Sequence, residues 1–378
     1  MFNLTWLFFR LKYMNINLQG RFCDNSGYAK VNKNLVSGLE KLGIKVSVKP
    51  LDKKGNTSLP VFPSCSKKSI GIDSIVPSLS VLPISKYKIL YTTIETNTLS
   101  KTFLDCIHNY HEIWLTSDYS EKILKKYFQD RKTFILPDSI DTKLYQEDGP
   151  KYSFEPSLKG FIFVSVFGWS YRKGYDVLLK SYLQEFTSKD NVTLLIVAKL
   201  NYKQNLQSIK ETIQKYIEIY GGDSPPLVVR FEKEIEEKNM PDIYRACDAF
   251  VLFTRGEGFG LPFIESSLCG LPVIGTNWSA PTMYLNNQNS NLLEIDTLGK
   301  VQPGQMPVHY WDNLEMPNLS SPEIIINARK LLRYVFENHK KCKEKNIKLQ
   351  NYIKENFSID VVANKAKKRL ETIWSKLK

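Results

Sequence analysis

The stretch Thr254-Arg-Gly-Glu-Gly-Phe-Gly-Leu-Pro-Phe-Ile-Glu265 decides how this chain of 378 residues is organised. The apolar run 249–253 precedes it and predicts a buried strand, and residues 262–269 predict a helix that Gly270 ends. A strand, a glycine-rich loop and a helix N-terminus, in this order, present backbone N–H groups and the positive end of a helix dipole to an anion. The stretch therefore predicts a phosphate-binding turn in an α/β protein.

Two carboxylates lie within this stretch. Glu257 falls in the loop before the helix, and Glu265 falls one turn inside it. One carboxylate can therefore face the reacting end of a ligand while the other contacts a part that is bound further back. The alternative is a surface loop with two solvated glutamates, because an isolated glycine-rich match is weak evidence.

The composition indicates a globular protein of two ordinary domains. Hydrophobic residues make up 42% of the chain and charged residues 24%. The six cysteines are scattered without a C-x-x-C pair, which favours reduced thiols in a cytoplasmic compartment. The four histidines form no zinc pattern, and the sequence has no Asp-x-Asp pair. We therefore expect no metal site.

The formal net charge of +13 suggests an anionic ligand, an anionic membrane surface or a nucleic acid, or simply general solubility. The excess of Lys and Arg is spread over both halves of the chain, and no RNP, helix-turn-helix or zinc-finger pattern occurs. We therefore expect no nucleic-acid partner.

The first thirteen residues begin with an apolar run that is too short to span a membrane. The run also lacks the basic start and the small-residue cleavage site of a signal peptide. A dispensable extension or an extra edge strand is the favoured interpretation, and a shallow, peripheral membrane contact is the third.

Short β-rich runs alternate with helical runs along the chain, which predicts parallel sheets covered by helices. Strands are expected at 15–19, 44–48, 88–92, 112–116, 133–136, 161–165, 192–197 and 227–231, and helices at 28–42, 117–124, 176–186, 240–247, 323–355 and 360–378. The polar stretch 146–159 is the expected linker. The fold class is thus α/β, with two doubly wound domains that bind ligands at the carboxyl ends of their strands.

The glycine-rich stretch closely resembles the Glu-x7-Glu signature of retaining glycosyltransferases of the GT-B fold, in particular glycosyltransferase family 4. The run Leu271-Pro-Val-Ile-Gly-Thr276 also resembles the strand that follows in this family. The resemblance implies two Rossmann-like domains that face each other across a cleft. Residues 1–148 would be the acceptor domain and 149–357 the nucleotide-sugar domain, and a helix at 358–378 would pack back on the first domain.

A second segment, Ser165-Val-Phe-Gly-Trp-Ser-Tyr-Arg-Lys-Gly174, is a solvated basic turn when taken alone. It resembles the Arg/Lys-Gly segment with which the family binds the donor diphosphate, where Arg offers a planar fork and Lys a point charge. Lys173 and Gly174 match. The arginine usual five positions before the lysine would fall at Gly168, so Arg172 is the expected substitute.

Two weaker resemblances and one departure concern the first half of the chain. Asp24-Asn-Ser-Gly-Tyr-Ala-Lys30 resembles the family's N-terminal glycine loop, and Gly27 is the position carried over, although Asn25 or Ser26 could simply cap a helix. Residues 135–145 resemble a segment near the hinge, with Asp138 where Asn is commoner. Many relatives have a histidine near the donor sugar, but the strand end here reads Tyr91-Thr-Thr-Ile-Glu-Thr96, so Glu95 either faces the cleft or is a plain surface carboxylate.

The resemblance implies a role for each matching residue. Glu257 would bind donor-sugar hydroxyls and stabilise positive charge at the anomeric carbon, and Glu265 would bind the ribose. Charge on the leaving diphosphate would be stabilised by the cations and by the loop backbone, namely Lys173, Arg172, Gly258, Phe259, Gly260 and Leu261.

The implied function is transfer of a hexose from a GDP-sugar such as GDP-mannose, or from a UDP-sugar, to a glycan, lipid-linked or protein acceptor. Retention of configuration is expected, without a cofactor or metal. The alternatives are a catalytically weak sugar-nucleotide-binding scaffold and a GT-B epimerase or phosphorylase. The oligomeric state stays open, with a homodimer as one option.

Overall fold

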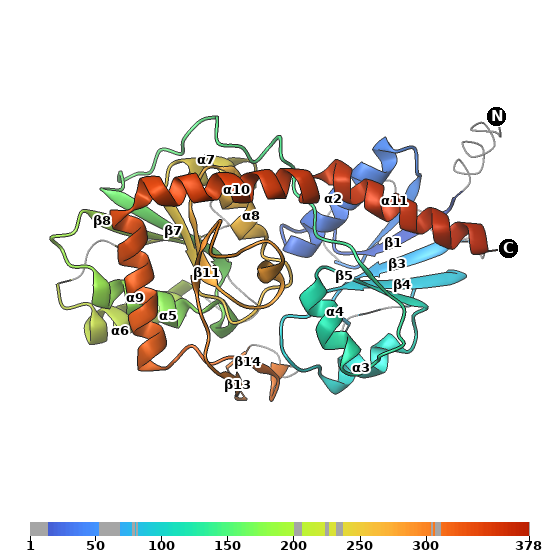
Figure 1. Cartoon of the computed structure of the whole chain (residues 1–378), viewed down its shortest axis with the longest axis horizontal. Coiled ribbons are helices and arrows are strands. Elements are labelled where there is room, and N and C mark those ends of the chain that lie inside the picture. Colours follow the sequence, from blue (N-terminus) through green and yellow to red (C-terminus); the bar gives the residue numbers. More distant parts are fainter. Residues whose placement is uncertain are drawn as a thin grey trace. The chain divides into compact units, whose positions relative to one another are not determined.

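The computed structural model describes residues 14–52, 69–77, 80, 82–199, 206–223, 227–231, 237–303, 305–306 and 311–377. The chain forms two compact units. The first consists of Met1–Ile94, Leu99–Asp141 and Glu355–Lys378, and the second of Glu95–Thr98 and Thr142–Lys354. Within the described residues, each unit holds a six-stranded sheet with helices on both faces (Figure 1).

The sheet of the first unit is parallel and has the order β2-β1-β3-β4-β5-β6. Its strands are β1 Ile16–Gly20, β2 Val46–Pro50, β3 Ile70–Ser74, β4 Tyr87–Thr92, β5 Glu112–Leu115 and β6 Thr133–Ile135. The order of the strands changes direction between β1 and β3, so the topological switch point of this unit lies there.

The helices of the first unit are α2 Gly27–Lys41, α3 Lys101–Ile107, α4 Asp118–Lys125 and α11 Ile359–Lys376. Ser26 caps α2, because its Oγ accepts the Ala29 N–H at 3.2 Å. The C-terminal helix α11 packs against α2. The two helices touch at Gly38 of α2, where a Cβ would lie 2.6 Å from the Cβ of Ala363.

The sheet of the second unit is also parallel and has the order β12-β11-β10-β7-β8-β9. Its strands are β7 Phe161–Gly168, β8 Val192–Lys199, β9 Leu227–Phe231, β10 Ala249–Leu252, β11 Val273–Thr276 and β12 Asn291–Leu293. An antiparallel pair, β13 Leu298–Lys300 and β14 Glu315–Pro317, lies outside this sheet. The helices are α5 Tyr175–Glu185, α6 Leu206–Tyr220, α7 Met240–Arg245, α8 Leu261–Leu268, α9 Pro322–Glu337 and α10 His339–Phe357.

The helices of the second unit divide into two groups. From the centre of this sheet, β8 and β9 are added on one side and β11 and β12 on the other. Because crossovers between parallel strands are right-handed, the helices that connect the strands on the two sides cover opposite faces of the sheet. The helix α5 contacts α6 and α9, whereas α8 contacts α7 (Figure 1). The direction changes between β7 and β10, which are adjacent. The loops that follow these two strands therefore meet at a switch point, where doubly wound sheets bind their ligands.

The prediction of two doubly wound α/β sheets is confirmed, but some elements were not predicted, among them the helices α3 and α6, and other details were wrong. The strand β3 was not predicted. The expected helix 323–355 is two helices, because Asn338 ends α9 and its side chain donates to the Tyr334 carbonyl at 2.9 Å. The expected linker 146–159 lies within the second unit, since Arg245 donates to the carbonyls of Gln146 and Pro150 at 3.0 and 2.7 Å.

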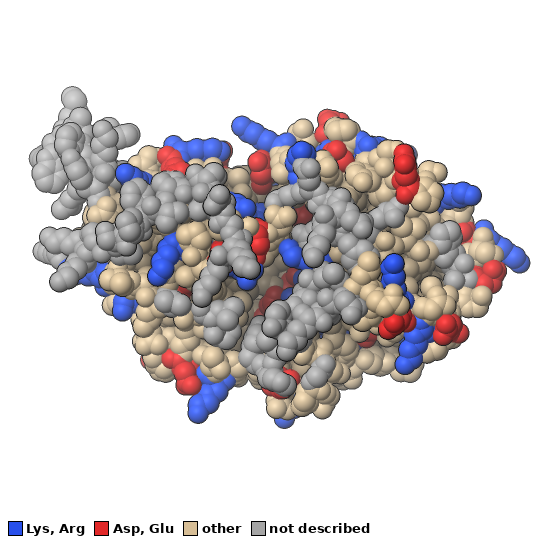
Figure 2. Space-filling model, turned by 180° about the vertical axis from the view of Figure 1, so that it is seen from behind, with Lys and Arg blue, Asp and Glu red and all other residues tan. Residues whose placement is uncertain are grey.

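The described residues contain no helix that is long and apolar enough to cross a membrane. Residues 1–13, for which an extension, an edge strand or a membrane contact was considered, lie outside the described residues. On the face drawn in Figure 2, Lys and Arg side chains alternate with Asp and Glu side chains over the described surface. Charges of both signs are therefore interspersed on this face.

Candidate functional site

Two loops of the second unit are joined at its switch point: the turn after β7 and the glycine-rich loop after β10. The Arg255 N–H donates to the Arg172 carbonyl at 2.6 Å, and the Thr254 hydroxyl donates to the same oxygen at 3.2 Å. Gly174 has a φ of +66°, and a Cβ there would lie 1.7 Å from the Phe253 carbonyl oxygen. Only glycine permits this close approach, so the turn and the loop form one rigid surface.

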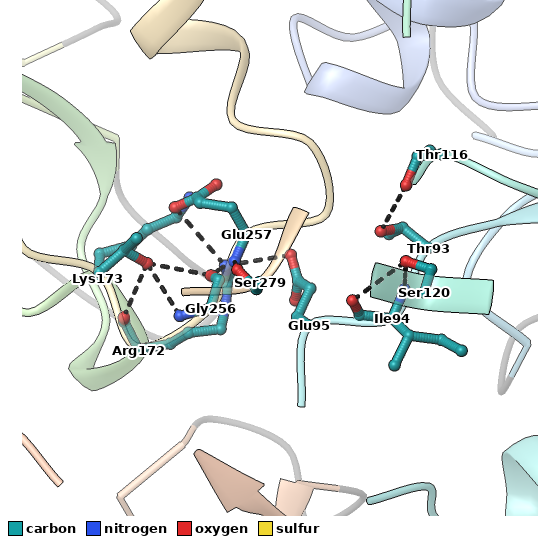
Figure 3. Close-up of polar contacts among 11 residues, drawn as sticks. Thr93, Ile94, Glu95, Thr116, Ser120, Arg172, Lys173, Gly256, Glu257 and Ser279 are labelled. Carbon is teal, nitrogen blue, oxygen red and sulfur yellow. Dashed lines mark hydrogen bonds and ion pairs between the residues drawn. The ribbon is translucent and has the colours of Figure 1, made fainter. Parts of the chain in front are cut away.

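A buried ion pair lies where the two loops meet. The Lys173 Nζ is 2.5 and 2.7 Å from the two carboxylate oxygens of Glu257, which is 4% exposed (Figure 3). The Arg172 Nη1 is 3.9 Å from the same carboxylate and donates to the Gly256 carbonyl. Burial lowers the pKa of Lys173, and the Glu257 carboxylate opposes that shift. The structure thus brings together three of the residues that the sequence analysis selected.

Glu95 is a second carboxylate of this cluster. Its Oε1 is 3.1 Å from the Arg172 Nη1 (Figure 3). Its carboxylate also accepts the Gly258 backbone N–H. The side chain is 17% exposed, so the alternative of a plain surface carboxylate is wrong. Burial raises the pKa of Glu95, although Arg172 and Lys173 pull it down. The backbones of Glu95 and Gly256 also lie close together, because a Cβ at Gly256 would lie 2.2 Å from the Glu95 carbonyl oxygen.

The segment that carries Glu95 is held by the β13–β14 hairpin. Asn97 donates its backbone N–H to the Glu315 carbonyl at 2.8 Å and its side-chain amide to the Glu315 carboxylate at 2.9 Å. The Glu315 N–H donates to the Thr98 hydroxyl at 2.9 Å. Trp311, from the apolar cluster beneath the hairpin, places its ring 5.6 Å from the Arg172 guanidinium. The hairpin thus fixes both partners of the Glu95–Arg172 pair.

Arg255 is a supporting residue that the sequence analysis missed. Its side chain is fully buried and its guanidinium donates to both carboxylate oxygens of Asp176 at 2.8 and 2.7 Å. It also donates to the Tyr171 carbonyl at 2.7 Å and lies 3.7 Å from the centre of the Tyr171 ring. These contacts fix the turn from which Arg172 and Lys173 project.

The remaining part of the glycine-rich loop leads into α8. Gly260 precedes the helix with a φ of +90°, and the Tyr284 hydroxyl donates to the Phe259 and Gly260 carbonyls at 2.6 and 3.1 Å. The Glu257 N–H donates to the Ser279 hydroxyl at 2.9 Å. Leu261 is the first residue of α8. The loop carbonyls thus have partners that hold the loop in place at the positive end of the helix.

Glu265 lies inside α8 and is 4% exposed. The Tyr244 hydroxyl of α7 donates to its Oε2 at 3.1 Å, and burial raises the pKa of Tyr244 well above its ordinary value. Gly27, in contrast, is the first residue of α2 in the first unit. Ser26, not Asn25, supplies the cap of that helix.

The described residues contain no group of three or more His, Cys, Asp or Glu side chains that could hold a metal ion.

A family model described as Glycosyl transferases group 1 matches residues 159–298, which include the turn after β7 and the glycine-rich loop. Among curated proteins, a GDP-mannose-dependent monoacylated alpha-(1-6)-phosphatidylinositol monomannoside mannosyltransferase of Corynebacterium glutamicum is 27% identical over 180 residues, 44% of this chain and 44% of the relative. Mannosylfructose-phosphate synthase of Agrobacterium fabrum is 26% identical over 150 residues, 39% of this chain and 31% of the relative. The chain thus matches less than half the length of these relatives.

Two solved structures resemble the whole chain. Sucrose-phosphate synthase from Thermosynechococcus elongatus has a TM-score of 0.68 at 13% identity and covers 96% of this chain and 99% of its own. HepE of Anabaena, solved in complex with UDP and glucose, has a TM-score of 0.66 at 12% identity and covers 95% of this chain and 100% of its own. This likeness shows that the chain has the GT-B fold, as its sequence predicts.

Proposed function

We propose that this chain is a retaining glycosyltransferase that moves a hexose from a nucleotide diphosphate sugar to an acceptor hydroxyl. The observation that carries the proposal is the buried Lys173–Glu257 pair, with Arg172 beside it, at the switch point of the second unit. The match to Glycosyl transferases group 1 covers this part of the chain.

The cations of the cluster bind the donor diphosphate. Lys173 and Arg172 supply charge, and the backbone of Gly258, Phe259, Gly260 and Leu261 supplies N–H groups at the positive end of α8. Negative charge grows on the diphosphate as the glycosidic bond breaks. Donors that are already fixed in place stabilise this charge without reorganisation, so they lower the barrier to transfer.

Glu257 binds hydroxyls of the donor sugar and stabilises the positive charge that develops at the anomeric carbon. The bond from that carbon to the diphosphate oxygen breaks, the acceptor oxygen bonds to the same face, and the acceptor proton passes to the leaving diphosphate. This route retains the configuration. A covalent intermediate on Glu257 is the variant mechanism.

Glu265 binds the ribose hydroxyls, and Tyr244 orients its carboxylate through the 3.1 Å hydrogen bond. The proposed reaction needs no resident metal ion, since Lys173, Arg172 and the loop N–H groups supply the positive charge. The proposed location is the cytoplasm, at the periphery of a membrane if the acceptor is a lipid.

We propose only the chemical class of the donor, a nucleotide diphosphate sugar. The name of the Corynebacterium relative contains GDP-mannose, and the Anabaena structure contains UDP and glucose. GDP-mannose and a UDP-hexose are therefore the two donors to compare first. A glycan, a lipid-linked sugar or a protein is the proposed acceptor.

Calorimetric titration of the purified chain in the presence of EDTA tests the proposal. GDP-mannose, GDP-fucose, UDP-glucose, UDP-galactose and UDP-N-acetylglucosamine form the panel, and Lys173→Ala and Glu265→Ala are titrated alongside. Lys343→Ala is the control, because Lys343 is half-exposed and forms an ion pair with the half-exposed Glu147.

One sugar nucleotide should bind, both site variants should weaken it, and the control should not. Absence of binding to all five by a folded protein contradicts the donor site. Binding without release of nucleoside diphosphate favours the scaffold, and a change of the sugar without an acceptor favours the epimerase.

A further inference from the structure

The charged cluster at the switch point is electrically balanced without any ligand. Arg172 and Lys173 carry two positive charges, and Glu95 and Glu257 carry two negative charges. All four side chains are at most 17% exposed, so solvent screens them weakly. A diphosphate that enters this site adds at least two negative charges to a neutral cluster.

Glu95 already occupies an anion position in this cluster. Its carboxylate accepts the N–H of Gly258, which belongs to the loop proposed to bind the diphosphate, and it pairs with Arg172 at 3.1 Å. Backbone N–H groups and a guanidinium are the partners that a phosphate oxygen would take in the same place. The carboxylate and a phosphate oxygen therefore compete for the same donors.

We propose that Glu95 is an internal counter-anion that occupies the place of the donor diphosphate, and that it takes up a proton when the diphosphate binds. The inference rests on the proposed function and adds a regulatory residue to the same site. The proton comes from solvent and remains on the Glu95 carboxylate while the donor is bound. Protonation removes one negative charge and weakens the hold of Glu95 on Arg172 and on the Gly258 N–H, so these donors can turn to the diphosphate.

The surroundings of the two carboxylates explain why Glu95 takes the proton. Lys173 pairs with both oxygens of Glu257, at 2.5 and 2.7 Å. Among the described residues, the charged groups that act on Glu95 are Arg172, Lys173 and Glu257, and of these three the two cations favour its ionised form. A diphosphate engages both cations and adds negative charge. It therefore cancels the attraction by which Arg172 and Lys173 lower the pKa of Glu95. Burial, which already raises the pKa of Glu95, then favours the protonated acid.

The experiment measures proton uptake directly. UDP-glucose and GDP-mannose are titrated calorimetrically at pH 6, 7 and 8 in buffers with different enthalpies of ionisation, and the slope of the observed enthalpy gives the protons taken up. A nucleotide sugar is a better probe than a free nucleoside diphosphate, because its diphosphate has no terminal group that titrates in this range. The variants are Glu95→Gln, which keeps the shape but cannot titrate, and Glu147→Gln, a carboxylate of the same unit that is 54% exposed.

The wild type and Glu147→Gln should take up close to one proton per ligand at one of these pH values, and Glu95→Gln should take up none. The wild-type affinity should fall as the pH rises, by at most about tenfold per unit for one linked proton. The affinity of Glu95→Gln should be flat and, at pH 8, about tenfold higher than that of the wild type. Thermal unfolding verifies that both variants are folded.

Three outcomes would overturn the inference. Binding by the wild type without proton uptake at any pH overturns it and leaves the proposed function intact. Equal uptake by Glu95→Gln does the same, because the proton then resides elsewhere. Failure of the folded wild type to bind these two and the other three nucleotide sugars of the panel overturns this inference together with the donor site on which it rests.

Discussion

Each unit of this protein contains a buried carboxylate cluster, and the two clusters lie at opposite ends of their strands. In the first unit, Glu112 is the first residue of β5, and Arg369 of α11 donates to both of its oxygens at 2.7 and 2.8 Å. In the second unit, Glu257 follows the carboxyl end of β10 and pairs with Lys173. Ligands of doubly wound sheets bind at carboxyl ends. Position therefore favours a structural role for the first cluster and agrees with the ligand site that we propose at the second.

The two clusters also differ in how completely the protein supplies their partners. The Trp114 indole, the Tyr87 hydroxyl and Lys132 also contact Glu112, at 2.9, 3.0 and 3.1 Å. Burial alone would raise the pKa of Glu112, but its hydrogen-bond donors, Arg369 first among them, hold that pKa below its ordinary value. A carboxylate enclosed by a forked guanidinium and two aromatic donors is fixed. The Glu257 carboxylate pairs with a lysine next to a glycine-rich loop, and we propose that a ligand binds to the same lysine.

The largest effect should come from Glu257→Gln. The change keeps the size of the side chain but removes the charge that we assign to the developing cation of the sugar. Turnover of the donor should fall by about 10²- to 10³-fold, the range found when one preorganised electrostatic partner is lost. Release of nucleoside diphosphate measures the turnover. The urea midpoint should fall less than in the matched Glu112 variant, because Glu95 still balances one cation and burial favours the neutral form of Lys173. A fall as large as that of the Glu112 variant would assign Glu257 to stability instead.

The same substitution in the other cluster, Glu112→Gln, should reverse the pattern. It leaves Arg369 and Lys132 beside a neutral amide in a buried site, and breaking a buried pair costs about 3 kcal/mol. Urea unfolding of the first unit should therefore occur at lower concentration, while donor affinity is retained. An unchanged midpoint would mean that this cluster does not hold α11 to the sheet.

A pair of glycines sharpens the comparison at the level of the backbone. Gly174 and Gly43 have φ values of +66° and +80°, but only Gly174 has an atom in the way of a Cβ, the Phe253 carbonyl oxygen at 1.7 Å. Gly43→Ala should cost about 1 kcal/mol, the strain of a left-handed residue. Gly174→Ala should cost more and should weaken donor binding, because the turn must move away from the loop. Equal effects on thermal unfolding would contradict the close joining of the two loops.

The smallest effect concerns Asp138, at the carboxyl end of the first sheet. Burial raises its pKa to about 7, although the Tyr91 hydroxyl donates to it at 3.0 Å. A raised acid pKa stabilises the fold at low pH, and that contribution is lost as the pH rises through 7. Wild-type stability should fall on the order of 1 kcal/mol between pH 6.5 and 8, and Asp138→Asn should not show this fall. Parallel pH profiles of the unfolding midpoint would contradict the raised pKa.

The sequence predicts the fold well because the fold depends on local patterns. Alternating strands and helices, with glycines and caps at their ends, are visible along the chain, and the two parallel sheets follow from them. The end of helix α9 at Asn338 was not predicted, because apolar residues continue at helical spacing from α9 into α10. The strand β3 was missed because Ile70-Gly-Ile-Asp-Ser74 is short and contains a glycine and a buried aspartate, which are rare in strands.

The candidate site was predicted only where its residues stand in short motifs. The loop with Glu257 and the turn with Lys173 are such motifs, and the structure places them side by side. Glu95 was left open, because the direction of a side chain just after a strand depends on its tertiary partners. Arg255 and Asp176 are 79 positions apart, so no local pattern joins them. Their pairing follows from the adjacency of β7 and β10, which is a property of the sheet.

The most direct test of the account is proton NMR of the sugar during turnover, because the signal of the anomeric proton distinguishes the α from the β product. The nucleotide sugar that binds in calorimetry, with an axial (α) linkage, is incubated with the wild type and with Glu257→Gln. With water as the acceptor, the free hexose is observed before it mutarotates. The account predicts an α product together with release of nucleoside diphosphate, both lost in the variant. A β product, or turnover that persists in Glu257→Gln, would contradict it.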